Sequence, residues 1–386
     1  MPSSFIFNSV SRTHFGPGVA LQIAQLCESL GIMKPLIVTD QGIIKCQLLD
    51  PVLAAFNDYS VEPTLFSEVL ADPPEQSIFD ALAVANEAGC DGVIGFGGGS
   101  SMDVAKLLAI LLNTDQPLSA MYGVEMVTGQ RLPLIQVPTT AGTGSEATAV
   151  AIVTTGESTK AGVVSSILFA DHIVLDPELT LGLPAHVTAA TGIDAMVHAI
   201  EAFTSARLKN PLSDMVALKA LQLLSKNIVT AVQTGSNLEA RSDMLLGAML
   251  AGQAFANAPV GAVHALAYPL GGTYHIPHGL SNSLVLPHVL RFNAPAANDL
   301  YFEISQVMHG LDLNSINAAN AGQQLANYFA ELAGSLGLQT QLRQMNIKPE
   351  ALEDLASQSM NQQRLLINNP RVVELADALA IYQQAY

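Results

Sequence analysis

One aspartate and three histidines between positions 194 and 278 have the types and spacing of a metal-binding set. Asp194 and His198 are four residues apart in an apolar run without proline, so on a helix they share one face. His264 lies in a second apolar run, and His278 follows fourteen residues later, directly after Pro277. A carboxylate with three imidazoles suits a divalent transition metal such as Fe(II) or Zn(II).

The competing interpretation is that these are ordinary polar side chains of helices. A single Asp-x-x-x-His pair occurs often by chance, and a lone histidine in an apolar helix is more often a hydrogen-bonded core residue than a ligand. The chain has only nine histidines, however, and four of them fall within twenty-five residues: His264, His275, His278 and His288. This clustering favours metal binding.

The composition bounds the class of protein. The chain has 386 residues, of which 49% are hydrophobic and 13% charged, as in globular proteins with large cores. Its formal net charge of -17 argues against nucleic acid and anionic membrane as partners, because both need clustered Lys and Arg. We find no membrane-length apolar run, no signal peptide and no disulfide framework among the three cysteines. These features predict a cytoplasmic protein.

The order of elements predicts two domains. In the first half of the chain, short apolar strands alternate with helices, which is typical of a mostly parallel, doubly wound sheet. After Pro184 strand signals nearly vanish and helical periodicity dominates. We therefore predict an α/β dinucleotide-binding domain over residues 1–184, with a first strand within residues 5–15 and a β-hairpin turning at Gly156–Ser158. An all-α domain follows over residues 185–386.

A glycine-rich loop, GFGGGSSMD at 95–103, follows a predicted strand and opens a predicted helix. The backbone N–H groups of such a loop and the helix N-terminus suit a pyrophosphate, and bulky side chains would block that approach. The loop is not the G-x-G-x-x-G motif with an acid about twenty residues downstream. The candidate acid is Asp40, upstream at the end of a strand, where it would favour NAD over NADP. A helix or turn cap explains Asp40 equally well.

A second loop, PTTAGTGSE at 138–146, consists of small hydroxylated residues that can hydrogen-bond phosphate and nicotinamide. Thr and Ser are also common in turns, so this loop alone is only suggestive. Lys160 follows the predicted hairpin turn, where most lysines are merely solvated.

Together these segments resemble the iron-containing (group III) alcohol dehydrogenase family, which is related in fold to dehydroquinate synthase and glycerol dehydrogenase. The matching sequences are FGPG, GGGSSMDVAK, PTTAGTGSE, GIDAMVHAIEA and HALAYPLGGTYHIPHG. The resemblance extends over essentially the whole chain. It implies a dehydroquinate synthase-like fold: an α/β domain with a mostly parallel, Rossmann-like sheet, an all-α domain, and a cleft between them.

The resemblance also implies roles for individual residues. The metal ligands would be Asp194, His198, His264 and His278, with Fe(II) favoured by the family name and Zn(II) as the alternative. The residues holding the pyrophosphate would be Gly97, Gly98, Gly99, Ser100, Ser101 and Asp103. Those lining the rest of the cofactor would be Thr139, Thr140 and Thr143, with Lys160 and Asp40 at its ribose groups. Phe255 matches an aromatic residue near the nicotinamide.

One position departs from the family pattern. Many members read HALAHPLG, and the second histidine is often assigned to proton relay or substrate contact. This chain has Tyr268 at that position. Tyr268 can hydrogen-bond the substrate or simply pack, and His275 is an alternative relay that can equally well be an ordinary surface residue.

The implied function is a metal-dependent, NAD(P)-linked alcohol dehydrogenase or aldehyde reductase, with hydride transfer between a metal-bound small alcohol and the nicotinamide. A hydroxyacid-oxoacid transhydrogenase and an NAD-recycling lyase of the same fold are alternatives. A metal hydrolase or a non-enzymatic binding protein is remoter, because the cofactor loops argue against both. The few cations favour small neutral alcohols and aldehydes as substrates. The family implies a homodimer or larger homo-oligomer.

Overall fold

The structure is a computed structural model that describes residues 4–156 and 159–386. The chain divides into two compact units: the α/β unit, residues 8–182, and the helical unit, which joins residues 183–386 to the segment that ends at Phe7. Part of the hairpin turn predicted at Gly156–Ser158 lies outside the described residues. The secondary structure confirms the predicted fold class, an α/β region followed by an all-helical one.

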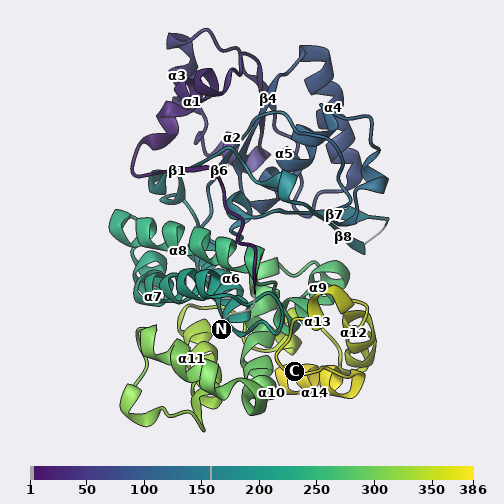
Figure 1. Ribbon diagram of the computed structural model, residues 1–386. Helices are drawn as coiled ribbons and strands as arrows, with labels where there is room; N and C mark the ends of the chain where they lie inside the picture. The colour runs from purple at the N-terminus through teal and green to yellow at the C-terminus, as the bar shows by residue number, and fades with distance from the viewer. Residues whose placement is uncertain (1–3, 157–158) are drawn as a thin grey trace. The chain divides into compact units, whose positions relative to one another are not determined.

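The α/β unit is built on a six-stranded sheet in which every neighbouring pair is parallel (Figure 1). The strand order is β1-β9-β6-β4-β2-β3. Its strands are β1 (Arg12–Phe15), β2 (Pro35–Val38), β3 (Thr64–Phe66), β4 (Gly92–Gly97), β6 (Leu134–Pro138) and β9 (His172–Leu175). The four inner strands are buried along their whole length, as expected for a parallel sheet covered on both faces.

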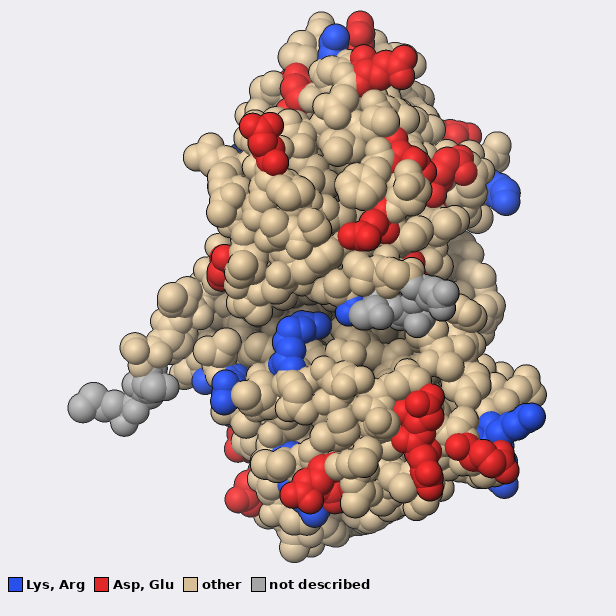
Figure 2. Space-filling view, turned by 90° about the vertical axis from the view of Figure 1, so that its right-hand side faces the viewer, with Lys and Arg blue, Asp and Glu red and all other residues tan. Residues whose placement is uncertain are grey.

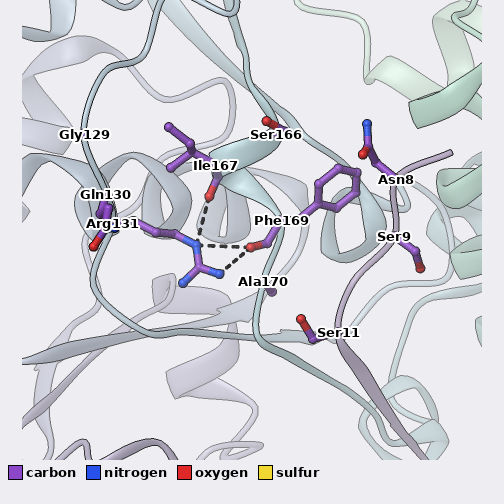
Figure 3. A pocket seen from close by; sticks show the side chains of 10 residues that line it. All are labelled: Asn8, Ser9, Ser11, Gly129, Gln130, Arg131, Ser166, Ile167, Phe169 and Ala170. Atoms are coloured by element: carbon purple, nitrogen blue, oxygen red, sulfur yellow. Dashed lines mark hydrogen bonds between the residues drawn. The ribbon is translucent and has the colours of Figure 1, made fainter. Parts of the chain in front are cut away.

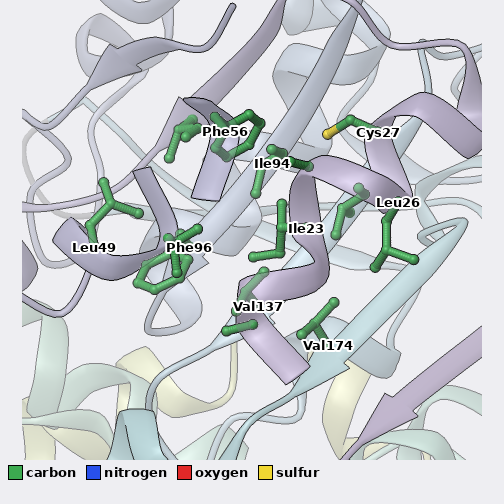
Figure 4. Packing of buried hydrophobic residues seen from close by; sticks show 14 of the residues in the cluster. Ile23, Leu26, Cys27, Leu49, Phe56, Ile94, Phe96, Val137 and Val174 are labelled. Carbon is green, nitrogen blue, oxygen red and sulfur yellow. The ribbon is translucent and has the colours of Figure 1, made fainter. Parts of the chain in front are cut away.

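Helices follow the strands of this unit: α1 (Ile23–Leu30), α2 (Gln41–Lys45), α3 (Asp50–Ala55), α4 (Glu75–Ala88) and α5 (Gly99–Leu111). The apolar face of α1 packs on one side of the sheet, and Figure 4 shows Ile23 beside Ile94, Val137 and Val174 of the strands. Burial of such side chains stabilises the unit by about 1.5–3 kcal/mol each. This core fixes the strand ends from which the loops leave.

Two details of the α/β unit differ from the sequence-based expectation. The first strand covers only Arg12–Phe15, because its partner β9 is four residues long and the segment up to Phe7 groups with the helical unit. A small second sheet, β5-β8-β7, was not predicted as a sheet. Its strands are β5 (Gly123–Val124), β7 (Val150–Thr155) and β8 (Thr159–Val164). The antiparallel pairing of β7 with β8 confirms the predicted hairpin.

The helical unit contains α6 (Ala185–Thr204), α7 (Pro211–Gln233), α8 (Leu238–Asn257), α9 (Ala262–Tyr274), α10 (His278–Val307), α11 (Ala321–Ser335), α12 (Leu352–Ser359), α13 (Gln363–Leu366) and α14 (Leu375–Ala385). α6 is buried over most of its length and packs against α7, α8 and α10, so it is the central helix of the unit. The expectation that no apolar run has membrane length is wrong for α7, which is long and apolar enough to span a membrane. It packs against α6 and α8, however, and 50% of that stretch is buried, as in the core helix of a bundle.

The surface carries the acidic excess of the composition. Figure 2 shows one face, on which Asp and Glu are scattered over many places and Lys and Arg are fewer. The distribution agrees with the net charge of -17 and gives no basic stripe on this face for a polyanion.

Candidate metal centre and cofactor loops

Four side chains from three helices of the helical unit converge on one point. The ligand atoms of Asp194, His198, His264 and His278 all lie within 4.8 Å of one another. α6 carries the first two one turn apart, His264 lies in the first turn of α9, and His278 is the first residue of α10. Among the described residues, no second group of three or more His, Cys, Asp and Glu side chains gathers in this way.

A glycine lets α10 start close enough to α6 for this geometry. A Cβ atom at Gly279 would lie 2.4 Å from the carbonyl oxygen of Ala190 and 3.3 Å from the Cβ of Asp194. Any larger residue would push the first turn of α10, and His278 with it, away from Asp194. The close packing of the cluster therefore requires Gly279 directly after His278.

The carboxylate of Asp194 is held by a neighbouring amide. Asn282, one turn after His278 on α10, donates from Nδ2 to Asp194 Oδ1 over 2.5 Å. Burial alone would raise the pKa of Asp194, but the three imidazoles and the Asn282 N–H outweigh it and hold the pKa below its usual value. Asp194 is thus kept ionised at 1% exposure. Sequence reasoning missed Asn282.

A second carboxylate, also missed, contacts the cluster from behind. Glu201 follows His198 by three residues on α6, and its Oε2 lies 2.6 Å from His264 Nδ1. Its Oε1 accepts from the backbone N–H of Val263 over 2.7 Å. The spacing Asp194, His198, Glu201 was a usable signal, because i, i+4 and i+7 lie on one helix face.

Aromatic rings surround the imidazoles. Phe255 on α8 stacks on His198 with 4.5 Å between ring centroids, and the His198 and His264 rings are 4.7 Å apart. Tyr268, one turn after His264, lies 6.1 Å from the His278 ring. His275 is exposed and ends α9 in a left-handed conformation with φ of 54°.

The donor set fits a divalent transition metal. One ionised carboxylate and three imidazoles are N/O donors of the kind that bind iron or zinc. Three of the four residues are buried, whereas the His278 side chain is 42% exposed, so solvent reaches the cluster on that side. This combination suits a site with protein ligands on one side and an accessible position on the other.

In the α/β unit, the glycine loop leaves β4 and opens α5. The N-cap residue Gly98 supplies no side-chain cap, so the first N–H groups of α5, from Gly99 onward, have no side-chain acceptor at the cap. Gly97 has a φ of 151°, and a Cβ there would lie 2.8 Å from the Ser101 hydroxyl oxygen. Both features leave the backbone at the start of α5 without covering side chains, which is compatible with close approach of an anion.

The loop at 138–146 lies directly against the glycine loop. A Cβ at Gly99 would be 2.9 Å from Thr143 Cγ2, and the nearest atom to a Cβ at Gly98 belongs to Thr140, at 3.9 Å. Thr139 is buried and donates its N–H to the carbonyl of Gly97 over 3.0 Å. The structure therefore places Thr139, Thr140 and Thr143 beside the glycine loop.

Asp40 lies two residues after the end of β2, beside the glycine loop. Its Oδ1 caps α2 by accepting from the N–H groups of Gly42 and Ile43 at 2.8 and 3.2 Å. Its Oδ2 lies 3.4 Å from the Cβ position of Gly97. The cap interpretation is thus observed, while the second oxygen lies close to the glycine loop.

Asp103 and Lys160 make protein contacts. Asp103 accepts from the Ser145 hydroxyl over 2.6 Å and from the Ile152 N–H over 2.9 Å. Lys160 on β8 pairs with Asp72 at 2.5 Å and donates to Thr154 Oγ1 over 3.1 Å. Asp103 thus ties α5 to the loop at 138–146 and to β7, whereas Lys160 ties β8 to β7 and to the turn at Asp72.

A surface hollow of about 450 Å³ also lies within the α/β unit (Figure 3). Arg131 lines it, but its guanidinium donates to the carbonyls of Ile167 and Phe169 and pairs with Asp171. Because this cation is engaged by the protein itself, the hollow offers no charged group for a ligand.

Comparison with known proteins agrees with this geometry. The family described as iron-containing alcohol dehydrogenase matches residues 11–177, and the Fe-containing alcohol dehydrogenase family, C-terminal, matches residues 188–386. Long-chain-alcohol dehydrogenase 1 of Geobacillus thermodenitrificans is 36% identical over 377 residues, which are 97% of this chain and 95% of that protein.

Solved structures agree as well. The crystal structure of a 1,3-propanediol oxidoreductase is 34% identical, covers 100% of both chains and gives a TM-score of 0.95. That of sulfoacetaldehyde reductase from Bifidobacterium kashiwanohense in complex with NAD+ is 29% identical, covers 100% of this chain and 99% of the other, and gives a TM-score of 0.87. The chain therefore belongs to the iron-containing alcohol dehydrogenase family of NAD-dependent oxidoreductases.

Proposed function

We propose that this enzyme interconverts small neutral alcohols and their aldehydes or ketones, with NAD as the hydride carrier and one divalent metal held by Asp194, His198, His264 and His278. The convergence of the four donor atoms within 4.8 Å carries the proposal. The family and its relatives support alcohol oxidation and aldehyde reduction as the reaction class.

The residues around the donor set prepare it for a metal. Fe(II), with Zn(II) as the alternative, supplies Lewis acidity toward a substrate oxygen when it is bound. Asp194 provides the one negative charge of the set, and Asn282 orients it through the 2.5 Å hydrogen bond. Phe255 covers one face of the His198 ring, which shields that ligand from water.

The loops of the α/β unit are proposed to bind NAD. The pyrophosphate would be held by Gly97, Gly98, Gly99, Ser100 and Ser101, where the start of α5 presents N–H groups. The carboxylate of Asp40 would repel a 2′-phosphate and so favour NAD over NADP. The NAD+ complex of the sulfoacetaldehyde reductase supports this choice of cofactor. Asp103 would act on the cofactor by fixing the loop at 138–146, and Lys160 is assigned to a ribose of the cofactor.

Substrate contact is assigned to the aromatic rings beside the cluster. Tyr268 lies near the partly exposed ligand His278, whereas His275 ends a helix at the surface, so Tyr268 is the better candidate for hydrogen bonding the substrate. The names of the relatives show that members of the family act on chemically different substrates, among them a long-chain alcohol, 1,3-propanediol and sulfoacetaldehyde. The scarcity of cations in this chain favours neutral ones. We also expect a cytoplasmic homo-oligomer.

The test is NADH formation by anaerobically purified protein with a panel of short alcohols, before and after chelation, with Fe(II) or Zn(II) added back. Activity that is lost on chelation and restored by one metal supports the proposal and names the metal. Activity that is indifferent to chelation contradicts the metal assignment. No NADH from any alcohol despite bound NAD would favour the transhydrogenase or the lyase, and no NAD binding at all would favour the hydrolase.

A further inference from the structure

We propose that Glu201 is a positioning residue of the metal centre, which selects the tautomer of His264 and fixes its ring so that Nε2 points at the cluster. The inference rests on the proposed function in one respect, that the four-residue cluster binds a metal. Glu201 would then set the metal affinity of the enzyme without being a ligand.

The two oxygens of Glu201 have separate donors. Oε2 lies 2.6 Å from His264 Nδ1, and Oε1 accepts from the Val263 N–H over 2.7 Å. The side chains of Glu201 and His264 are only 6% and 4% exposed, so solvent does not compete for these bonds. Because an ionised carboxylate only accepts hydrogen bonds, Nδ1 of His264 must carry the proton. The Nε2 lone pair is then available to a metal.

A separate contact shows which edge of the His264 ring faces the cluster. Asn282, whose amide holds Asp194, has its Nδ2 3.3 Å from His264 Nε2 and also 3.3 Å from His278 Nε2. The nitrogen remote from Glu201 is thus the one inside the cluster. Glu201 and the cluster lie on opposite edges of the same imidazole.

Glu201 is also tied to the start of α9, which keeps the carboxylate in place. The N-cap residue Gly261 provides no side-chain cap, and Glu201 of α6 takes over this task by accepting from Val263 in the first turn. The positive end of the α9 dipole favours a negative charge there. Since His264 follows Val263 in sequence, one carboxylate fixes both the helix start and the ligand on it.

A glutamine cannot reproduce this arrangement. It has a single side-chain oxygen, so its NH2 group would face either the N–H of Val263, where the bond is lost, or Nδ1 of His264. In the second case Nδ1 can accept only if the ring proton moves to Nε2, the nitrogen that a metal needs. A residue that only stabilised the fold would lower stability on substitution and leave the metal affinity of the folded protein unchanged. The positioning role predicts that metal affinity itself falls.

The first experiment compares Zn(II) affinity by competition with a chromophoric chelator for the wild type and for Glu201→Gln. We expect affinity to fall by about 10- to 100-fold, the usual effect of losing a partner of a metal-ligating histidine. The matched control is Asp243→Asn in the same unit, where the acid on α8 accepts from Asn227 over 2.8 Å. Its Zn(II) affinity should stay within about twofold of the wild type. Equal affinities of E201Q and wild type overturn the inference and leave the proposed function standing.

A second measurement needs no substitution at Glu201 and so holds even if E201Q does not fold. In wild-type protein with 15N-labelled histidine rings, His264 is assigned from the signal that disappears in His264→Asn. Both before and after loading with Zn(II), its proton should reside on Nδ1. A proton on Nε2 before loading overturns the inference. Wild-type protein that binds no Zn(II) removes the proposed function instead, whereas the tautomer before loading still reports on Glu201.

Discussion

The ammonium of Lys106 donates to the hydroxyl of Ser145 over 2.8 Å and joins α5 to the loop at 138–146. Lys106 is fully buried and also donates to Thr148 Oγ1 and to the carbonyl of Val150. Burial lowers its pKa, an effect that the nearby carboxylates of Asp103 and Glu146 oppose. The two segments proposed to bind NAD thus share one buried cation.

Replacing Lys106 by Met should destabilise the α/β unit. The change removes three buried hydrogen bonds and leaves their acceptors without this donor, which costs about 3 kcal/mol. The urea midpoint should fall, and NADH titration should show weaker binding because the loop at 138–146 loses its anchor. The control is Lys219→Met, an exposed lysine that donates only to Gln222 in the described structure and should cost less than about 0.5 kcal/mol. An unchanged urea midpoint for K106M would contradict this account.

Gly99→Ala should weaken cofactor binding while the metal centre is unaffected. The new Cβ would lie 2.9 Å from Thr143 Cγ2, so the two loops must separate. Overpacking of this kind costs about 1–3 kcal/mol. If the loops must return to the wild-type spacing to bind, NADH affinity in a fluorescence titration should fall by about 5- to 150-fold. Gly182→Ala is the control, because in the described part of the chain no atom beyond its two sequence neighbours lies within 4 Å of its Cβ position. Wild-type NADH affinity in G99A would count against the glycine loop as the pyrophosphate site.

The sequence predicted what depends on local periodicity and turn chemistry. Alternation of short strands with helices gave the fold class, and the strand that enters the glycine loop is β4 as expected. Asp194 and His198 sharing one helix face and the histidines clustered further on predict the donor set. The structure brings His264 and His278 of that cluster together with Asp194 and His198. These inferences need only neighbours in sequence and the residue types that metals prefer.

The contacts that support the site could not be predicted in the same way. Glu201 to His264 spans 63 residues and Asn282 to Asp194 spans 88, so neither follows from a helical repeat. Asp40 shows a different limit, because a carboxylate between a strand and the next helix can either cap that helix or bind a ribose. Only the structure shows that Oδ1 caps α2 while Oδ2 lies close to the glycine loop.

Asn282→Leu should lower metal affinity through Asp194. Leucine has the same branching but no N–H, so the carboxylate loses the donor at 2.5 Å and the constraint on its orientation. We expect metal affinity to fall by about tenfold or more. It is measured from the metal that the protein retains after dialysis against graded concentrations of a chelator. Ser283→Ala is the control, since this neighbouring hydroxyl is buried and has no hydrogen-bond partner among the residues that the structure describes. The prediction fails if N282L and S283A retain metal equally.

The last prediction concerns Glu146, whose carboxyl is 2% exposed beside the Lys106 network. Burial raises its pKa to about 7, although its own backbone N–H and Lys106 oppose the shift. Between its ordinary value of 4.5 and about 7, the folded chain therefore keeps a proton that the unfolded chain has released. The contribution of this group to stability is complete below 4.5 and is lost as the pH rises to 7, with a slope of at most about 1.4 kcal/mol per pH unit.

Glu146→Gln removes this titration and keeps the shape of the neutral side chain. Relative to the wild type, the variant should have a similar urea midpoint at pH 5 and a higher one at pH 8, where the wild type must bury an ionised carboxylate. The control is Glu62→Gln, at an exposed position of the same unit. The difference between its urea midpoint and that of the wild type should be the same at pH 5 and at pH 8. If E146Q is instead less stable than the wild type at pH 8, the attraction of the ionised Glu146 to Lys106 outweighs the cost of burial, and the predicted rise of its pKa is wrong.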